Sequence, residues 1–270
     1  MTMASIPSLA PPRAAPARAV SGAVRAGAGQ CVLPLALVLG LELLATAGIL
    51  DARFVPTPRV VAGGFLGLVG SGEVWPHLRD TFLRIVQGYA IAAVLGIGLG
   101  LCLGVVRRAR AYVMPVLEVL RPIPGVTLLP LTILWFGMGN RSQIPVIAFA
   151  AFFPTFVNTV HGVEEVPPSL VQAARVMELR GAALFRKVML PCSIPQIFTG
   201  LRLSVIYALT SCVGTEIIAG TDGLGFLILD YERTFVTDKM FAVMILIAGL
   251  GFCLNAGVMA AQSRILRYRA

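Results

Sequence analysis

The stretch TFLRIVQGYAIAAVLGIGLGLCLGVV, residues 81–106, decides what kind of protein this chain can be. It contains one charged side chain, Arg84, and the basic residues Arg107 and Arg108 follow it at once. An apolar run of about 20 residues is long enough to cross the hydrocarbon core of a membrane as a helix. We therefore interpret 81–106 as a transmembrane helix that stops at a basic boundary.

The composition of the whole chain supports this interpretation. Of 270 residues, 57% are apolar and only 13% are charged, whereas a soluble domain carries roughly 25% charged residues. So few charges cannot cover a water-exposed globule, which excludes a soluble enzyme. The formal charge of +9 reflects membrane topology rather than nucleic-acid binding, because the arginines stand at the ends of apolar runs.

Apolar length predicts an all-α integral membrane protein with six transmembrane helices. Residues 1–29 are rich in Ala and Pro and have no acidic residue, so we expect a disordered cytoplasmic tail. Residues 30–270 form the membrane domain. The expected spans are 31–50, 81–106, 112–138, 143–160, 197–219 and 241–261. A cleaved signal peptide is the alternative for the first span, whose length favours a retained helix.

The distribution of basic residues indicates the orientation of the spans. With the N-terminus inside, 13 Lys and Arg residues fall on cytoplasmic segments and six on outer segments. Short cytoplasmic loops are enriched in Lys and Arg. We therefore expect both termini in the cytoplasm, with the loop 161–196 as the longest inner connection.

Two features inside the spans need an explanation, and the first is the presence of charged residues. A charge at the centre of a membrane helix costs at least about 2.5–3.5 kcal/mol. Such charges belong either to a proton or substrate pathway or to helix ends and structural ion pairs, and Glu118 and Arg121 are spaced to pair with each other. The structural interpretation is favoured for all of them except Glu42. The residues are Glu42, Glu118, Arg121, Arg202 and Glu216.

The second feature is a small residue at every fourth position of the second span. Such a stripe allows another helix to approach closely in a membrane. The partner helix belongs either to the same chain, which is favoured, or to a second copy. The stripe is Gly88, Ala92, Gly96, Gly100 and Gly104.

No motif for ATP hydrolysis, cofactor binding or metal binding occurs in the sequence. Lys187 and Lys239 are the two lysines, and neither follows a glycine as a P-loop requires. The five cysteines stand singly, without a CxxC pair. We therefore expect no enzyme activity, cofactor or metal, and any energy for transport has to come from a partner.

The loop 161–196 contains two short helical stretches. Ser169 is the expected N-cap of an amphipathic helix that runs to Glu178. A second stretch is expected to begin at Ala182 and to end at Pro191. Helices of this kind either lie on the membrane surface or dock into a groove of a partner protein.

This loop resembles the signature of binding-protein-dependent ABC importer permeases. That signature is Glu-Ala-Ala, three residues, Gly, nine residues, Ile, one residue, Leu-Pro. The chain has Gln172-Ala173-Ala174, Glu178, Val188 and Leu190-Pro191 at the same spacing. Further strings, among them Arg121-Pro122-Ile123-Pro124, are similar to the nitrate, sulfonate and taurine branch, and the similarity covers about residues 31–268.

The resemblance implies a half-transporter with the type I, MetI-like permease fold in the bacterial cytoplasmic membrane. Its partners would be membrane lipid, a second permease copy in a homodimer, two ATP-binding subunits, and a periplasmic or lipid-anchored solute-binding protein. The solute would be a small molecule such as a sulfonate, taurine or nitrate. The implied ATPase-coupling residues are Gln172, Ala173, Ala174, Arg175, Met177, Glu178, Gly181, Leu190 and Pro191.

Two residues depart from the signature. Gln172 replaces the usual Glu, so a charge-assisted contact becomes a neutral hydrogen bond, roughly half as strong. Glu178 stands at the glycine place, where a positive φ is costly for a residue with a side chain. We expect Gly181 to take over the turn and the partner ATPase to have an altered groove.

Two alternatives from other classes stay open on the sequence. The first is an ion-coupled secondary transporter with Glu42 or Glu118 as its proton site. The second is a degenerate membrane scaffold that does not transport, with the small-residue stripe as its assembly surface. The signature loop argues against the first, because a secondary carrier has no need of it.

Overall fold

The computed structural model describes residues 36, 39–40, 42–47, 51 and 54–266, and it separates into two units, 1–59 and 60–270. In the first unit residues 42–46 are helical, and the Glu42 carboxylate accepts a hydrogen bond from the Arg59 amide at 3.4 Å. The expected tail 1–29 and most of the expected span 31–50 lie outside the described residues.

The described part of the second unit is helical. Four of its helical stretches are long and apolar enough to cross a membrane, and a fifth is added if a bent pair counts as one span. The expected number of six is therefore not confirmed. The helices are α2 (Pro58–Ser71, beginning in the first unit), α3 (Val74–Val105), α4 (Arg107–Leu120), η1 (Gly125–Leu128), α5 (Leu129–Phe136), α6 (Asn140–Glu164), α7 (Pro168–Val176), α8 (Gly181–Leu184), η2 (Phe185–Met189), α9 (Leu190–Ala219), α10 (Leu224–Arg233) and α11 (Thr237–Ile265).

The expected span over 112–138 is broken into two helical pieces in the structure. The chain forms two pieces there, α4 and the η1–α5 segment, and they are bent by 86° at the break. Pro122 and Pro124 explain the break, because neither proline has the backbone N–H that a continuing helix would need as a hydrogen-bond donor. Pro115, in contrast, lies inside α4 and does not end it.

The loop helix expected from Ala182 to Pro191 does not end at Pro191. α8 continues through η2, a π-helical turn, into α9, and Gly181–Ala219 is one helical stretch of 39 residues. A π turn changes the hydrogen-bond register by one residue. The register change falls directly before Leu190-Pro191, where a regular α-helix would lose a bond and meet a steric clash.

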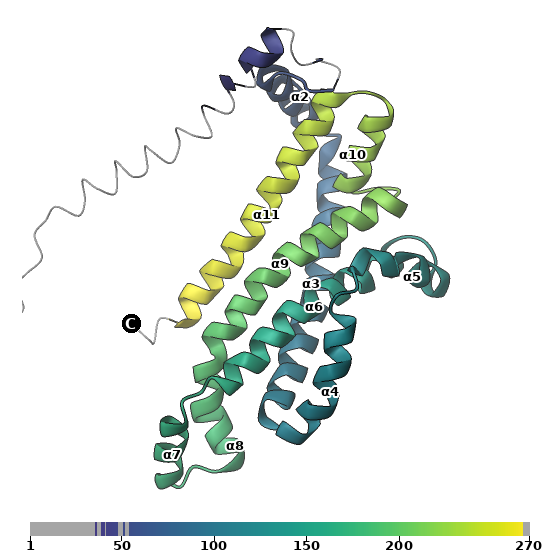
Figure 1. The fold of residues 1–270 in the computed structure, drawn as a ribbon. Coiled ribbons are helices and arrows are strands. Elements are labelled where there is room, and N and C mark those ends of the chain that lie inside the picture. The colour runs from purple at the N-terminus through teal and green to yellow at the C-terminus, as the bar shows by residue number, and fades with distance from the viewer. Residues whose placement is uncertain (1–35, 37–38, 41, 48–50, 52–53, 267–270) are drawn as a thin grey trace, which may run out of the picture. The chain divides into compact units, whose positions relative to one another are not determined.

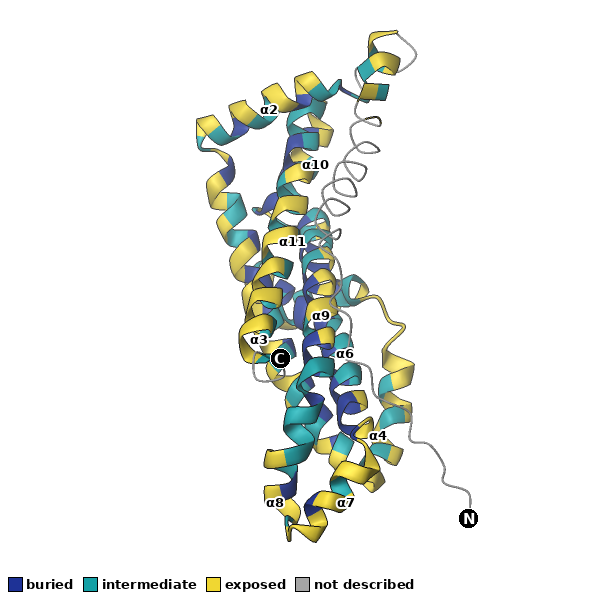
Figure 2. Ribbon diagram, turned by 90° about the vertical axis from the view of Figure 1, so that its left-hand side faces the viewer, coloured by how far each residue is buried: buried dark blue, intermediate teal, exposed yellow. Residues whose placement is uncertain are grey.

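Helix α6 lies between α3 and α9 and makes the most extensive contacts in the molecule with these two helices. Its buried residues form the dark core of the bundle in Figure 2. The small-residue stripe of α3 faces α6 of the same chain. A Cβ atom on Gly100 would lie 2.6 Å from Thr159 Cβ, and one on Gly104 would lie 2.7 Å from Val163 Cβ. The small residues thus permit an interhelical approach that larger side chains would prevent.

The two ends of the second unit differ in what they carry. Helices α7 and α8 lie together at one end, and α2 and α10 lie at the other (Figure 1). At the α10 end the Tyr231 hydroxyl donates a 2.9 Å hydrogen bond to Glu73, and Lys239 lies 3.4 Å from the same carboxylate. The hydrogen bond from Tyr231 and the charge of Lys239 lower the pKa of Glu73.

We predict that Gly100→Ala destabilises the protein and that Gly98→Ala does not. The first substitution forces a methyl group into the α3–α6 contact, an overpacking that costs about 1–3 kcal/mol. Gly98 lies on the same helix, and a Cβ atom there would have no neighbouring atom within 4 Å. Thermal unfolding of the two purified variants in detergent measures the difference, and equal melting temperatures would contradict the packing role of the stripe.

Candidate functional site

A buried carboxylate, Glu216, is the centre of a polar cluster near the end of α9. Its side chain is fully buried. The Thr81 hydroxyl donates to it at 2.9 Å, Arg84 Nη1 lies 2.8 Å from Oε1, and the Gly225 amide donates to Oε2 at 2.9 Å. A buried charge is tolerated when it is paired and its remaining lone pairs are hydrogen-bonded, and these three donors meet that requirement.

The turn between α9 and α10 is shaped around this carboxylate. Gly223 has φ +103°, and a Cβ atom there would collide with the carboxylate of Glu216. A Cβ atom on Gly225 would lie 2.6 Å from the Val213 carbonyl oxygen. The Leu224 amide between them donates to the Thr81 hydroxyl at 2.8 Å. Glycine at both positions lets the backbone reach the carboxylate.

Arg84 extends the cluster to two more elements. Its guanidinium pairs with Asp222 in the α9–α10 turn, and its Nε donates to Asn140 Oδ1 at 2.6 Å at the start of α6. The cluster therefore joins α3, α6, α9 and α10. Sequence patterns did not connect Glu216 with Thr81 and Arg84, although these two stand three residues apart on one helix face, a signal that two polar groups point the same way.

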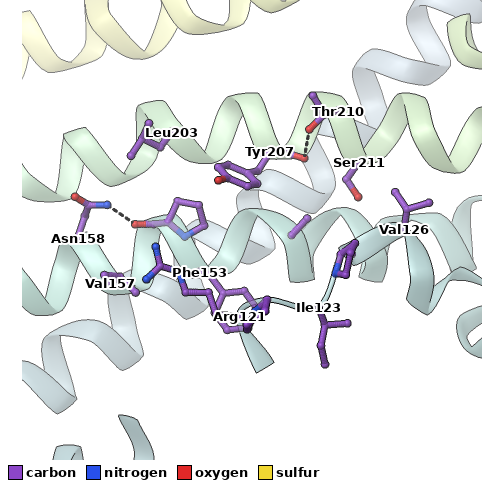
Figure 3. Close-up of a pocket in the computed structure, with 15 residues that line it drawn as sticks. Arg121, Ile123, Val126, Phe153, Val157, Asn158, Leu203, Tyr207, Thr210 and Ser211 are labelled. Atoms are coloured by element: carbon purple, nitrogen blue, oxygen red, sulfur yellow. Dashed lines mark hydrogen bonds between the residues drawn. The ribbon is translucent and has the colours of Figure 1, made fainter. Parts of the chain in front are cut away.

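The other charged residues of the expected spans lie elsewhere. Glu118 and Arg121 are both exposed, and no ion pair joins them among the described residues. Arg121 lines a pocket of about 470 Å³ between the α4–η1 bend, α6 and α9, which Figure 3 shows in close-up. Arg202 is exposed on α9 and lines a different hollow beside α11.

Helix α7 carries most of the signature residues, and its two ends differ from what the sequence predicted. It begins at Pro168 with Pro167 as the N-cap, so the expected N-cap Ser169 is wrong. A proline at the first helical position needs no partner for its nitrogen and already has a helical φ. The helix thus starts without a side-chain cap.

At the other end Glu178 adopts the left-handed conformation, with φ 60°. The Leu179 amide donates to the Ala174 carbonyl at 3.0 Å, and the Glu178 amide donates to the Arg175 carbonyl at 3.0 Å. These two bonds form a Schellman motif, which ends a helix with one left-handed residue. The expectation that Gly181 takes over the turn is wrong, because the turn stays at the signature position and Gly181 has its own positive φ of 52°.

The two faces of α7 are unequal in exposure. Val176 and Met177 are 85% and 75% exposed, and Ala173 and Arg175 are exposed as well. Ala174 is only 5% exposed, and the helix contacts α8 and η2. The structure therefore divides the signature residues between an outer face and a face that packs on the chain itself.

Three polar contacts hold the helices that flank the α7 loop. The Ser193 hydroxyl donates to the Gly162 carbonyl at 2.8 Å, and Gln196 Nε2 donates to Glu165 at 2.8 Å, so α6 and α9 are joined at their loop ends. Arg110 of α4 pairs with Glu164, the last residue of α6. These contacts hold α4, α6 and α9 together at the end where the α7 loop begins and ends.

Comparison with known proteins defines the class. The family of binding-protein-dependent transport system inner membrane components matches residues 92–267. A protein of Bacillus subtilis (strain 168), provisionally named as an aliphatic sulfonates transport permease, is 33% identical over 88% of this chain and 86% of its own length. The taurine transport system permease of Escherichia coli (strain K12) is 32% identical over 82% of both chains. An inward-facing methionine ABC transporter structure gives a TM-score of 0.58 at 19% identity, over 71% of this chain and 94% of its own.

The fold and the comparisons define a multi-pass membrane permease of the ABC importer class. The chain belongs to the family of binding-protein-dependent transport system inner membrane components, in the nitrate, sulfonate and taurine branch. It is a transport subunit and not an enzyme, since ATP hydrolysis in ABC transporters takes place in separate ATPase subunits. Family membership also decides against the ion-coupled carrier and confirms the predicted class.

We predict that Glu216→Ala strongly destabilises the protein. The substitution leaves the buried Arg84 guanidinium without its buried partner, and breaking one side of a buried pair costs roughly 3–5 kcal/mol. Glu118→Ala removes an exposed carboxylate and serves as the matched control. Thermal unfolding in detergent should show a large loss of melting temperature for the first variant and little change for the second.

We predict that Glu178→Gly stabilises the end of α7 by about 1 kcal/mol, because glycine adopts the left-handed conformation without the steric cost that a side chain brings. Glu178→Ala retains that cost and should give no gain. Hydrogen exchange of the amides in 174–179 reports the local stability. Exchange that slows equally in both variants would assign the effect to the lost charge instead of the backbone.

Proposed function

We propose that two copies of this chain form the membrane pathway of an importer that moves a small solute into the cytoplasm. Each copy would receive one ATP-binding subunit on α7, and a solute-binding protein would deliver the solute from outside. The observation that carries the proposal is the exposed apolar end of α7, Val176 and Met177, on a segment joined to a membrane helix. A helix with an apolar face and no cover among the described residues of its own chain suits a groove of a partner protein.

The proposed orientation of the chain in the membrane follows from the position of α7. A cytoplasmic ATPase has access to α7 only if the α7 end is cytoplasmic. The positive-inside distribution of Lys and Arg independently favours that orientation, with both termini inside. The Glu216 cluster and α10 then belong to the outer half of the protein.

For the solute, we propose a small organic molecule that carries a sulfonate group. The two relatives named above carry the names of aliphatic sulfonates and taurine in their transport systems. Both compounds have a sulfonate group. Uptake into liposomes that contain the reconstituted permease, its ATPase and its binding protein, with radiolabelled taurine and ethanesulfonate as probes, tests this choice.

We predict that Met177→Asp uncouples the permease from its ATPase. The substitution places a charge in the apolar contact of α7 with the partner groove, and the helix itself remains intact because Met177 is 75% exposed. ATPase subunits should no longer co-purify with the permease, and ATP-dependent uptake should be lost.

Arg264→Asp, an exposed change at the C-terminal end of α11, is the control for altered charge on the same side of the protein. It should leave co-purification and uptake unchanged. If Met177→Asp binds the ATPase as well as the parent protein does, α7 is not the docking helix.

A further inference from the structure

The pocket beside the break between α4 and η1 lies in the middle of the membrane helices. Its walls on α6 run from Ala150 to Asn158, and those on α9 run from Leu203 to Ser211. These positions are central in Asn140–Glu164 and Leu190–Ala219. The pocket therefore lies between the Glu216 cluster at one end and the α7 loop at the other.

The bend between α4 and η1 forms the third wall of the pocket. Residues 121–124 are not helical, yet they lie at the depth of the spans. Non-helical backbone at membrane depth is tolerated only where protein covers it or where it lines a water-filled cavity. Gly125 lies close to α6 and α9, since a Cβ atom there would be 2.9 Å from Ala150 Cβ and 3.5 Å from Ser211 Oγ. The bend is packed on one side and lines the pocket on the other.

The charge in the pocket is of one sign. Among the described residues that line the pocket, Arg121 is the only charged one, and no lining residue is acidic. Glu118, one turn earlier on α4, does not line the pocket and makes no ion pair with Arg121 in the described part of the chain. Figure 3 shows the Arg121 side chain reaching from the bend toward Val157 and Asn158 of α6. An ionisable residue at this depth indicates a function by default.

Hydroxyl groups supply hydrogen-bond donors on the opposite wall. Ser211 is 4% exposed, and its Oγ is buried without a hydrogen-bond partner among the described residues. A buried polar group normally has a partner, so an unpaired hydroxyl on a pocket wall indicates a group that a ligand or a water molecule satisfies. Tyr207, which Figure 3 shows on the same helix as Ser211, also lines the pocket.

We propose that this pocket binds the anionic group of the transported solute, with Arg121 as the counter-charge and the hydroxyls of Ser211 and Tyr207 as donors. The inference rests on the proposed function, because the pocket is part of a pathway only in a transporter. It adds that the permease itself selects for negative charge, after the solute has left the binding protein. A single positive charge without a carboxylate in the pocket wall disfavours cations in the same space.

Charged thiol reagents measure the potential in the pocket without knowledge of the solute. The five native cysteines are replaced by alanine, and Thr210→Cys places one thiol in the pocket wall. The reconstituted permease–ATPase complex is labelled with the anionic 2-sulfonatoethyl methanethiosulfonate and with the cationic 2-(trimethylammonium)ethyl methanethiosulfonate. The ratio of the two rates cancels effects on the thiol itself and reports the charge that an approaching ligand meets.

We expect the anion-to-cation rate ratio at Thr210→Cys to fall at least about fivefold when Arg121→Gln is added, because one nearby unit charge acts with opposite sign on the two reagents. Arg121→Lys should keep the ratio. A thiol at Ser263→Cys, at the end of α11, is the control and should show the same ratio with and without Arg121→Gln. An unchanged ratio at Thr210→Cys, or no labelling there by either reagent, would overturn the proposal.

Uptake separates this inference from the proposed function. If the parent complex imports taurine or ethanesulfonate, Arg121→Gln should lower the initial rate at least about tenfold while the ATPase still co-purifies. Normal uptake by Arg121→Gln would refute the anion site and leave the importer assignment intact. If the parent complex imports neither probe, the choice of solute fails, and the rate ratio still decides whether the pocket favours anions.

Discussion

The carboxylate of Glu216 has to find its hydrogen-bond donors within the chain, because it is fully buried. The donors come from α3 and from the start of α10, and Arg84 also holds Asn140 at the start of α6. One buried charge therefore fixes the relative positions of four helices. The walls of the Arg121 pocket, α6 and α9, belong to this set, so the shape of the pocket depends on the cluster although the two sites share no residue.

Much of the fold could be predicted from local properties of the sequence. Apolar length indicated the regions in which the long helices α3, α6, α9 and α11 lie, and the fourfold spacing of small residues in α3 predicted a close helix contact. Family resemblance supplied the class of the protein and the importance of the loop. These features depend on residues near one another in the sequence, where spacing and composition carry the information.

The Glu216 cluster could not be predicted in the same way. Thr81 and Arg84 are 135 and 132 residues away from Glu216, so the pairing depends on how α3, α6 and α9 pack. The left-handed conformation of Glu178 could not be predicted from the sequence either. Its side chain makes a positive φ costly, but the two Schellman bonds and the contacts of α7 with α8 and η2 hold the turn in place. Tertiary structure overrides a local preference of about 1 kcal/mol.

The continuity of α8, η2 and α9 has a mechanical consequence. The stretch Gly181–Ala219 has 39 residues, and at about 1.5 Å per residue it is roughly 58 Å long. It begins next to α7 and contains Glu216 close to its other end. Because the helical stretch is long, a small tilt at Gly181 produces a larger displacement of its opposite end. The π turn at Phe185–Met189 is then the place where the stretch can bend, and its stiffness sets how much of a movement at α7 reaches the Glu216 end of the stretch.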